Sequence, residues 1–428
     1  MQLTLLITKL LICSALLSCQ SNGHKEQSAY PTDPNNVSLQ LPEGFHAFIV
    51  TDQLGRGRHI TINTNGDMYV SLRQKKNDKG AVALRDTNGD GRADVIEYFS
   101  DINGTSIRIF NGYLYQSDDM SVFRTKLSSD HLVPQDNPEV IATGFINQNQ
   151  HSAKTFCISD EGNLFVNVGA PSNACMESSR TKGSPGMDPC PQLERQAGIW
   201  KFKADILNQN QSNDAVHYAK GIRNAVALCW NEKEQELYAV QHGRDQLSQF
   251  FPELFDDEAN AQLPAEEFFL VEEGSNCGWP YCYYDQLQDK KVLAPEYGGD
   301  GNKIERCNDM EMPIMAFPGH LAPNDLLFYT GNQFPERYKD GAFIAFHGSW
   351  NRAPLEQEGF FVVFVPMRNG LPSGTWEIFA NGFAGEKPIN SPRDANHRPC
   401  GLAQAPDGSL LVVDSQQGSV YRIFYQEK

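Results

Sequence analysis

Positive charge is scarce in this chain of 428 residues, where 36 Lys and Arg stand against 53 Asp and Glu and give a formal net charge of −17. A protein that binds DNA or RNA needs cations to place against phosphates, so this balance argues against a nucleic-acid partner. The composition also argues against disorder, because 40% of the residues are hydrophobic and 11% are aromatic. We therefore expect an acidic globular protein with a substantial core.

The apolar run near the N-terminus is short. It extends from Leu10 to Leu17, eight residues, whereas a helix that spans a bilayer needs about 20. This is the length of the apolar part of a signal peptide. Ser18 and Cys19 follow, and the sequence LLSC resembles the lipobox at which bacterial lipoproteins are cleaved and lipidated. The segment 1–18 is therefore predicted to be a lipoprotein signal peptide, with an ordinary secretory signal as the alternative.

A lipid on Cys19 would be the only membrane attachment of the mature protein. The polar residues 19–40 are expected to form a flexible tether, and residues 41–428 the folded domain. Gln20 occupies the position at which Asp would retain a lipoprotein at the inner membrane. We thus expect an exported protein of the outer membrane that faces the periplasm or the cell surface.

No CxxC or CxxCH motif occurs among the ten cysteines, which argues against a zinc finger and a c-type haem. Without the two N-terminal cysteines eight remain, an even number suited to an oxidising compartment. Cys175 and Cys190 flank a loop rich in Ser, Gly and Pro, so a bridge there would restrict a long unfolded segment. The predicted disulfides are Cys175–Cys190 and Cys282–Cys307. The remaining cysteines, for which no pairing can be predicted, are Cys157, Cys229, Cys277 and Cys400.

One pattern recurs along the chain, while helical periodicity is nearly absent. A short apolar strand, a turn that in most copies contains Gly, and a second apolar strand together predict a β-hairpin. The six copies lie at 59–73, 107–118, 155–169, 225–243, 325–348 and 401–415. With further strand-like segments between them, they predict an all-β fold, a six-bladed β-propeller with four-stranded antiparallel blades and loop insertions. The end strand 419–425 should pair with the early strand 45–51 and hide a sheet edge. An all-β sandwich is the alternative, but it does not account for the repetition.

Cations and imidazoles gather in the loops beside the predicted hairpin strands, which converge on one end of the central channel. Guanidinium groups bind carboxylates through two parallel hydrogen bonds, so this pattern predicts a site for an acidic ligand. The residues are Arg56, Arg58, His59, His151, Lys154, Arg223, Asn224, His242, Arg244, His347, Arg352, His397 and Arg398.

Several segments together resemble the glucose/sorbosone dehydrogenase family, the soluble six-bladed propellers that use pyrroloquinoline quinone (PQQ). They are QHSAKTFCISDEGNLFVNVGAPSNAC, KGIRNAVALCW, QHGRDQL, GSNCGWPYCYYD, FIAFHGSWNR and HRPCGLAQAPDGSLLVVD. The resemblance extends from about Leu41 to Tyr425. It implies a PQQ-dependent enzyme that oxidises the C1 hydroxyl of an aldose, or a sugar-derived aldehyde, and passes electrons to an external acceptor.

The resemblance also assigns residues. His151 matches the catalytic histidine, and imidazole suits a general base that takes the hydroxyl proton. Arg223 and Asn224 match the pair that hydrogen-bonds the quinone carbonyl and stabilises charge on its oxygen. His242 is assigned to the cofactor.

Two arginines are expected at the carboxylates of PQQ, of which there are three. Arg398 matches one arginine of the family, but its companion two residues later is replaced here by Cys400. The cofactor-contacting lysine of the family falls near residues 349–352, which makes Arg352 the candidate.

Calcium is expected at three places. The resemblance places one ion beside PQQ on the carbonyls of Gly243 and Arg244, and another on the Glu267 carboxylate and the Cys277 carbonyl. Independently of any family, the segment DTNGDGRADVIE fits the spacing of a calcium-binding loop, which we expect to have a structural role. Its predicted ligands are Asp86, Asn88, Asp90, Arg92 through its carbonyl, Asp94 and Glu97. Two other function classes stay open: a calcium-dependent propeller hydrolase of the lactonase type, and a non-catalytic propeller that binds carbohydrate or protein.

Overall fold

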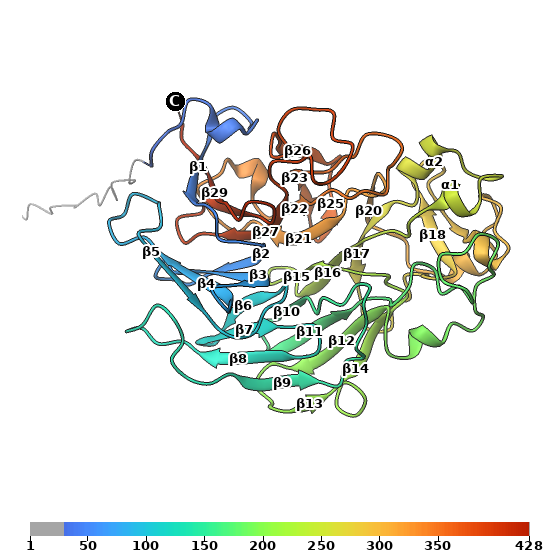
Figure 1. Ribbon diagram of the computed structural model, residues 1–428, viewed down its shortest axis with the longest axis horizontal. Coiled ribbons are helices and arrows are strands. Elements are labelled where there is room, and N and C mark those ends of the chain that lie inside the picture. Colours follow the sequence, from blue (N-terminus) through green and yellow to red (C-terminus); the bar gives the residue numbers. More distant parts are fainter. Residues whose placement is uncertain (1–29, 428) are drawn as a thin grey trace, which may run out of the picture.

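Six antiparallel sheets of at least four strands are arranged around a common centre in the structure, a computed structural model that describes residues 30–427 (Figure 1). The predicted six-bladed β-propeller is confirmed. The first blade contains β2 (Gly57–Ile62), β3 (Met68–Lys76), β4 (Lys79–Arg85) and β5 (Val95–Phe99). The second contains β6 (Ile107–Phe110), β7 (Tyr113–Ser117), β8 (Val122–Lys126) and β9 (Glu139–Thr143), with β13 (Gln209–Asn210) added in parallel to β9. The third contains β10 (Phe156–Ile158), β11 (Asn163–Val168), β12 (Gly198–Lys203) and β14 (Val216–Lys220).

The fourth blade contains β15 (Ala227–Asn231), β16 (Glu236–Gln241), β17 (Glu266–Val271) and β20 (Met315–Phe317). The fifth contains β21 (Pro323–Phe328), β22 (Ala342–Phe346), β23 (Phe361–Val365) and β26 (Glu377–Ala380). The sixth contains β27 (Pro399–Gln404), β28 (Leu410–Asp414), β29 (Val420–Tyr425) and β1 (Phe45–Thr51). The predicted hairpins are thus the first two strands of the six blades.

Insertions extend the propeller at one end, on the right of Figure 1. Between β16 and β17 lie the short helices α1 (Leu247–Phe250) and α2 (Asp257–Gln262), and between β17 and β20 the hairpin of β18 (Cys282–Asp285) and β19 (Lys290–Leu293). A small hairpin of β24 (Met367–Arg368) and β25 (Leu371–Pro372) lies between β23 and β26. No helix in residues 30–427 has the length and apolar character needed to cross a bilayer.

The ring closes between the two ends of the chain. β1 pairs antiparallel with β29, with Phe45 opposite Tyr425. The last blade therefore takes three strands from the C-terminal part and one from the N-terminal part, as predicted. This pairing covers the free edge of β29, and β1 becomes the outer strand of the sheet.

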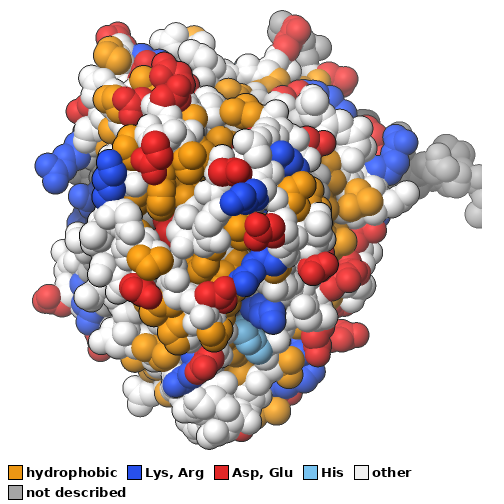
Figure 2. Space-filling model, turned by 90° about the vertical axis from the view of Figure 1, so that its right-hand side faces the viewer, with side chains coloured by type: hydrophobic (Ala, Val, Ile, Leu, Met, Phe, Trp, Pro, Cys, Tyr) orange, Lys and Arg blue, Asp and Glu red, His pale blue; other side chains and the backbone are white. Residues whose placement is uncertain are grey.

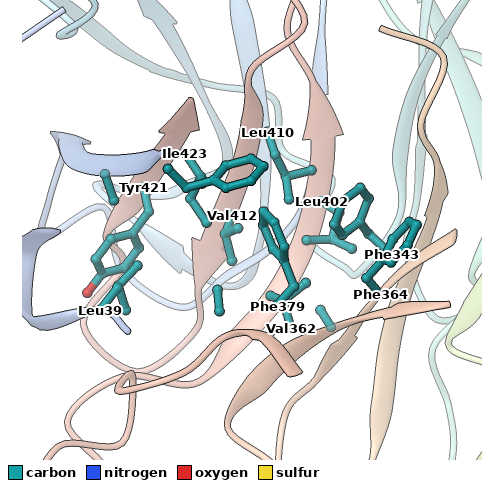
Figure 3. Close-up of a cluster of buried hydrophobic side chains, with 14 of the residues drawn as sticks. Leu39, Phe343, Val362, Phe364, Phe379, Leu402, Leu410, Val412, Tyr421 and Ile423 are labelled. Atoms are coloured by element: carbon teal, nitrogen blue, oxygen red, sulfur yellow. The ribbon is translucent and has the colours of Figure 1, made fainter. Parts of the chain in front are cut away.

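The core consists of apolar layers between neighbouring blades. β22 (AFIAF) and β23 (FVVFV) are buried at every position because both faces of their sheet are covered, which explains their continuous apolar sequences. Phe343, Phe364 and Phe379 of the fifth blade meet Leu402 and Val412 of the sixth, and each is at most 3% exposed (Figure 3). This packing holds the inner strands, and with them the loops at their ends, in fixed positions.

Residues 30–40, expected to be part of a flexible tether, instead contact the propeller. The Tyr30 ring lies 5.4 Å from the ring of Phe48 and 5.3 Å from that of Phe424. Gln40 forms two backbone hydrogen bonds with Asn381, of 2.9 and 3.1 Å. Residues 30–40 therefore belong to the packed domain. The predicted signal peptide 1–18 and the Cys19 anchor lie outside the described residues.

Both predicted disulfides, Cys175–Cys190 and Cys282–Cys307, are present. They fasten two insertions at the end of the propeller that carries α1, α2 and β18. Cys157, Cys229, Cys277 and Cys400 are free.

Candidate active site

A cavity of about 450 Å³ opens where the chain enters or leaves the inner strands of the third, fourth and fifth blades. Figure 2 shows the side of the molecule that carries the insertions, where Lys and Arg side chains lie among Asp, Glu and hydrophobic side chains. The ionisable residues that line the cavity are His151, Arg180, Arg223, His242, Asp245, Glu266 and His320. Ligand sites typically have this size and a few convergent polar groups, which makes the cavity the candidate active site.

Arg223 lies at the base of the cavity, just before β15, and is 2% exposed. Its Nη1 donates to the Gly243 carbonyl at 2.7 Å, and its Nη2 donates to Asn173 Oδ1 at 3.0 Å and Asp245 Oδ2 at 2.8 Å. Nε donates to the Asn173 carbonyl at 3.2 Å. These bonds use four of the five N–H groups of a guanidinium and leave one, on Nη1, for a ligand.

Asp245 connects three parts of the chain. Its Oδ2 lies 3.0 Å from Arg180 Nη2 as well as 2.8 Å from Arg223 Nη2, and its Oδ1 accepts from Asn351 Nδ2 at 2.8 Å. Arg223 and Arg180 hold the pKa of this buried carboxyl well below its usual value, although burial acts in the opposite direction. Asp245 is thus ionised near pH 7, and its carboxylate holds the guanidinium groups of Arg223 and Arg180 in position.

His151 is presented by a backbone with positive φ (+48°), ahead of β10. Its Nδ1 lies 2.7 Å from the Ala170 carbonyl, which can only accept, so Nδ1 carries the proton of the neutral ring. Burial, and next the charge of Arg223, lower the pKa of His151 to about 3. The ring is therefore neutral near pH 7, with the lone pair on Nε2, as a general base requires.

Gly169, just after β11, allows His151 and Asn224 to approach each other. A Cβ at this position would lie 2.6 Å from His151 Cβ and 2.8 Å from Asn224 Oδ1. Asn224 is buried, and its Oδ1 accepts from Asn167 Nδ2 at 3.2 Å. Two of the predicted catalytic residues are thus neighbours because the residue between them lacks a side chain.

His242 and Glu266 form the opposite wall. His242 Nε2 lies 2.7 Å from the Pro323 carbonyl, and burial lowers the pKa of this imidazole to about 4. The Glu266 carboxyl accepts the N–H groups of Gly243 at 2.8 Å and Ala322 at 3.0 Å, while burial raises its pKa to about 8. Glu266 therefore fixes the backbone at Gly243, one of the predicted calcium ligands.

Arg398 lies next to the cavity rather than in its lining. Its Nε donates to the His347 carbonyl at 3.0 Å, and its Nη2 donates to His347 Nδ1 at 2.8 Å and the Gly348 carbonyl at 2.6 Å. Burial and the charge of Arg58 lower the pKa of Arg398 to about 10. Ser349, which follows Gly348, lines the cavity, so this cation is one residue away from it.

Arg352, the predicted cofactor contact, does not reach the cavity. Its Nη1 donates to the Ala261 carbonyl at 2.6 Å, its Nε donates to the Glu356 carbonyl at 3.2 Å, and Glu358 lies 3.2 Å from Nη2. These partners hold the loop that follows Trp350. The Arg352 guanidinium group therefore stabilises this loop and is not directed toward a ligand in the cavity.

A lysine occupies the place predicted for a second calcium ion. Lys291 of β19 forms an ion pair with Glu267 Oε2 at 2.8 Å and donates to the Cys277 carbonyl at 2.6 Å. All three residues are buried, and Gln241 Nε2 donates to Glu267 Oε1 at 2.8 Å. Glu267 and Cys277 do lie together, as predicted, but the positive charge between them is an ammonium group. This arrangement does not fit a calcium ion.

The structure does not gather the predicted carboxylate ligands of the 86–97 segment into a metal-binding group. Asp86 accepts backbone N–H groups of Gly89 and Gly91, both at 2.7 Å, and Asp90 accepts that of Arg92 at 2.8 Å. Glu97, the expected bidentate ligand, lies on β5 opposite Ala83. Residues 30–427 contain no group of three or more His, Cys, Asp or Glu side chains placed to hold a metal. The loop, which includes Asn88 and Asp94, is closed by its own side-chain-to-backbone hydrogen bonds, which favour turns without any metal.

Arg180, Glu266 and His320 line the cavity but were not predicted. Arg180 belongs to the loop between Cys175 and Cys190, so the predicted disulfide was a usable signal for it. Glu266 directly precedes the predicted Glu267 in β17, and the sequence gives no reason to choose it as a site residue. His320 Nε2 lies 2.8 Å from the carbonyl of Asn260 in α2, a contact between an insertion and the connection of two blades that no local pattern reveals.

The sequence matches the TrAA12-like family over residues 39–426. The chain belongs to this family. This TrAA12-like protein is 26% identical over 321 residues to a PQQ-dependent pyranose dehydrogenase of Coprinopsis cinerea, covering 67% of this chain and 41% of that protein. It is 26% identical over 284 residues to an uncharacterized protein of Borreliella burgdorferi, covering 66% of this chain and 62% of that protein. It thus spans less than two thirds of either relative.

Solved structures share the fold of the TrAA12-like protein. The holo form of the PQQ domain of the C. cinerea pyranose dehydrogenase superposes with a TM-score of 0.72 at 20% identity, covering 92% of this chain and 98% of that chain. A calcium structure of a Trichoderma reesei family AA12 enzyme gives 0.72 at 17% identity, covering 94% and 98%. The PQQ-bound aldose sugar dehydrogenase of Streptomyces coelicolor gives 0.54 at 14% identity, covering 90% and 100%. The resemblance to PQQ-dependent sugar dehydrogenases is confirmed.

Proposed function

We propose that this protein is a PQQ-dependent dehydrogenase that oxidises the C1 hydroxyl of a pyranose or other aldose, or a sugar-derived aldehyde, and passes the electrons to an external acceptor. The observation that carries the proposal is a neutral histidine, His151, in a cavity with Arg223, which keeps one free N–H, and with Arg398 beside it, whose side chain pairs with no carboxylate of residues 30–427. In a protein of net charge −17, such a gathering of cations fits an acidic ligand. The pyranose and aldose dehydrogenase relatives support the same conclusion.

The residues present fit a cofactor with several carboxylates. The Arg398 side chain donates only to neutral groups within residues 30–427, namely His347 Nδ1 and the carbonyls of His347 and Gly348, so no carboxylate pairs with its guanidinium group. Arg223 keeps one free N–H at the base of the cavity. We assign Arg398 to a carboxylate, Arg223 and Asn224 to a quinone carbonyl, and His242 to the cavity wall against the cofactor. When bound, PQQ supplies the carbonyl group that accepts a hydride.

His151 takes the proton of the sugar hydroxyl in this proposal. The Ala170 carbonyl holds the ring with its lone pair on Nε2, and the low pKa keeps that lone pair free. Gly169 leaves room for His151 and Asn224 to lie close to each other, and the Ala170 carbonyl sets the orientation of the base. Positioning of this kind accounts for much of the rate enhancement that an enzyme achieves.

Calcium stays part of the proposal only at Gly243 and Arg244. The Gly243 carbonyl accepts one hydrogen bond, from Arg223, and a carbonyl oxygen has a second lone pair. Glu266 holds the backbone of Gly243 in place. The proposal predicts that calcium strengthens PQQ binding.

Activity of the reconstituted protein tests the proposal. Apo protein with PQQ and calcium should bleach an artificial electron acceptor when aldoses are added. A His151→Gln variant should bind PQQ like the wild type and lose more than nine tenths of kcat, because a base acts on the abstracted proton and not on cofactor carboxylates. A lactonase or a non-catalytic propeller would bleach nothing. A variant that kept a tenth or more of kcat would refute the assignment of His151.

Export as an outer-membrane lipoprotein anchored at Cys19 remains a separate proposal. Its support is the pair of disulfides, since disulfides persist in oxidising compartments. Labelling of cells with a palmitate analogue should mark the wild type and not a Cys19→Ala variant. Label on both would refute the anchor.

A further inference from the structure

The guanidinium group of Arg58 has no ion-pair partner among residues 30–427, and its charge acts on His242, which lines the cavity. Arg58 is the second residue of β2, the inner strand of the first blade. Its Nε is buried and makes no hydrogen bond, and the side chain forms no ion pair with an Asp or Glu of residues 30–427. A buried polar atom without a partner costs free energy. Arg58 is therefore a candidate for ligand binding.

Arg58 reaches the region around Cys400. β2 packs against β27, and a Cβ at Gly401 would lie only 2.3 Å from the Arg58 carbonyl oxygen, so the two backbones touch there. Cys400 is 0% exposed, and burial raises the pKa of its thiol. Among the charges that act on this thiol, that of Arg58 is the strongest and opposes the shift. The two side chains thus occupy the same part of the blade interface.

Within residues 30–427, neither the Arg58 side chain nor the Arg398 side chain forms an ion pair with a carboxylate. Arg58 and Arg398 both lower the pKa of His347, and the charge of Arg58 also lowers that of Arg398. The Asp414 carboxylate lies near this group, but its Oδ2 lies 3.0 Å from His397 Nδ1 and its Oδ1 accepts the backbone N–H of Arg398 at 2.6 Å. Two guanidinium groups therefore repel each other beside the cavity, and a ligand with more than one carboxylate would relieve that repulsion.

We infer that Arg58 is the second carboxylate-binding arginine of the cofactor site. It stands in, across the contact of β2 with β27, for the arginine that the resemblance to PQQ-dependent sugar dehydrogenases places at Cys400. The inference rests on the proposed function. In this arrangement the guanidinium groups of Arg58 and Arg398 bind carboxylates of the same cofactor molecule through paired hydrogen bonds.

The affinity for PQQ, measured by quenching of protein fluorescence in the presence of calcium, tests this role without any turnover. Arg58→Ala should weaken PQQ binding by about 10- to 1000-fold, as expected when one partner of a buried charge pair is removed. Arg58→Lys should recover part of the loss, since an ammonium keeps the charge but not the planar fork. Arg368→Ala, which removes one charge from the exposed hairpin of β24 and β25, is the matched control and should bind like the wild type.

The melting temperature of the apo protein separates binding from folding. Arg58→Ala should melt at the same temperature as the wild type or higher, because the substitution removes repulsion with Arg398. Wild-type PQQ affinity in Arg58→Ala would overturn the inference while leaving the proposed function intact. A wild-type protein that does not bind PQQ would overturn both.

Discussion

Lys291 provides a quantitative test of the structure, because it is a buried cation held by only two oxygen atoms and one aromatic ring. Its ammonium lies 2.8 Å from Glu267 Oε2, 2.6 Å from the Cys277 carbonyl and 4.9 Å from the centre of the Phe269 ring. Lys291→Met keeps the length and apolar character of the side chain but leaves the Glu267 carboxylate buried without a counter-charge. Removal of one partner of a buried ion pair typically costs about 3 to 5 kcal/mol.

Urea unfolding, followed by fluorescence, gives the free energy of unfolding for the comparison. Lys201→Met is the matched control, because Lys201 pairs with Glu273 at the surface, where ion pairs contribute about 0 to 1 kcal/mol. The double variant Lys291→Met, Glu267→Gln should recover much of the loss, since it removes both charges at once. A Lys291→Met variant as stable as Lys201→Met would refute the internal ion pair, and so would a double variant no more stable than the single one.

Three further predictions concern the base, the pH dependence of stability and the acidic loop. Gly169→Ala should lower kcat at least tenfold with PQQ still bound, because the new Cβ would displace the predicted base, and unchanged kcat would refute the close approach. Burial lowers the pKa of His59 to about 4 in the folded state against about 6.5 in the unfolded chain, so the unfolded chain binds the proton first as the pH falls. The free energy of unfolding should thus fall by about 3 kcal/mol between pH 6.5 and pH 4 through this residue, and His59→Asn should lose that part of the pH dependence measured by urea unfolding. Glu97→Gln should have the melting temperature of the wild type, both with calcium and with a chelator. If calcium raised the melting temperature of the wild type but not that of Glu97→Gln, the 86–97 segment would bind a metal after all.

The blades were predictable because their signals are local. Each inner hairpin combines alternating apolar residues with a turn, and Gly66, Gly162 and Gly408 take the positive φ that three of these turns require. The ring closure followed from counting strands. The fold could therefore be predicted almost completely from neighbouring residues.

The site was predictable only where its residues flank the inner strands. His151, Arg223 and His242 do so, and they line the cavity. Lys291 and Arg180 come from insertions, whose path over the propeller depends on packing between distant segments. Arg352 was assigned by its place in a motif, but nearby carbonyl groups determine where its side chain goes.

The pairing of β1 with β29 also determines when the sixth blade can fold. β1 is synthesised early, and its partner is the last strand of the ring, so the sixth blade cannot form until almost the whole chain has been made. Closing so long a loop costs conformational entropy that only the finished ring repays. Until that moment, the first strand lacks the partner with which it pairs in the finished ring.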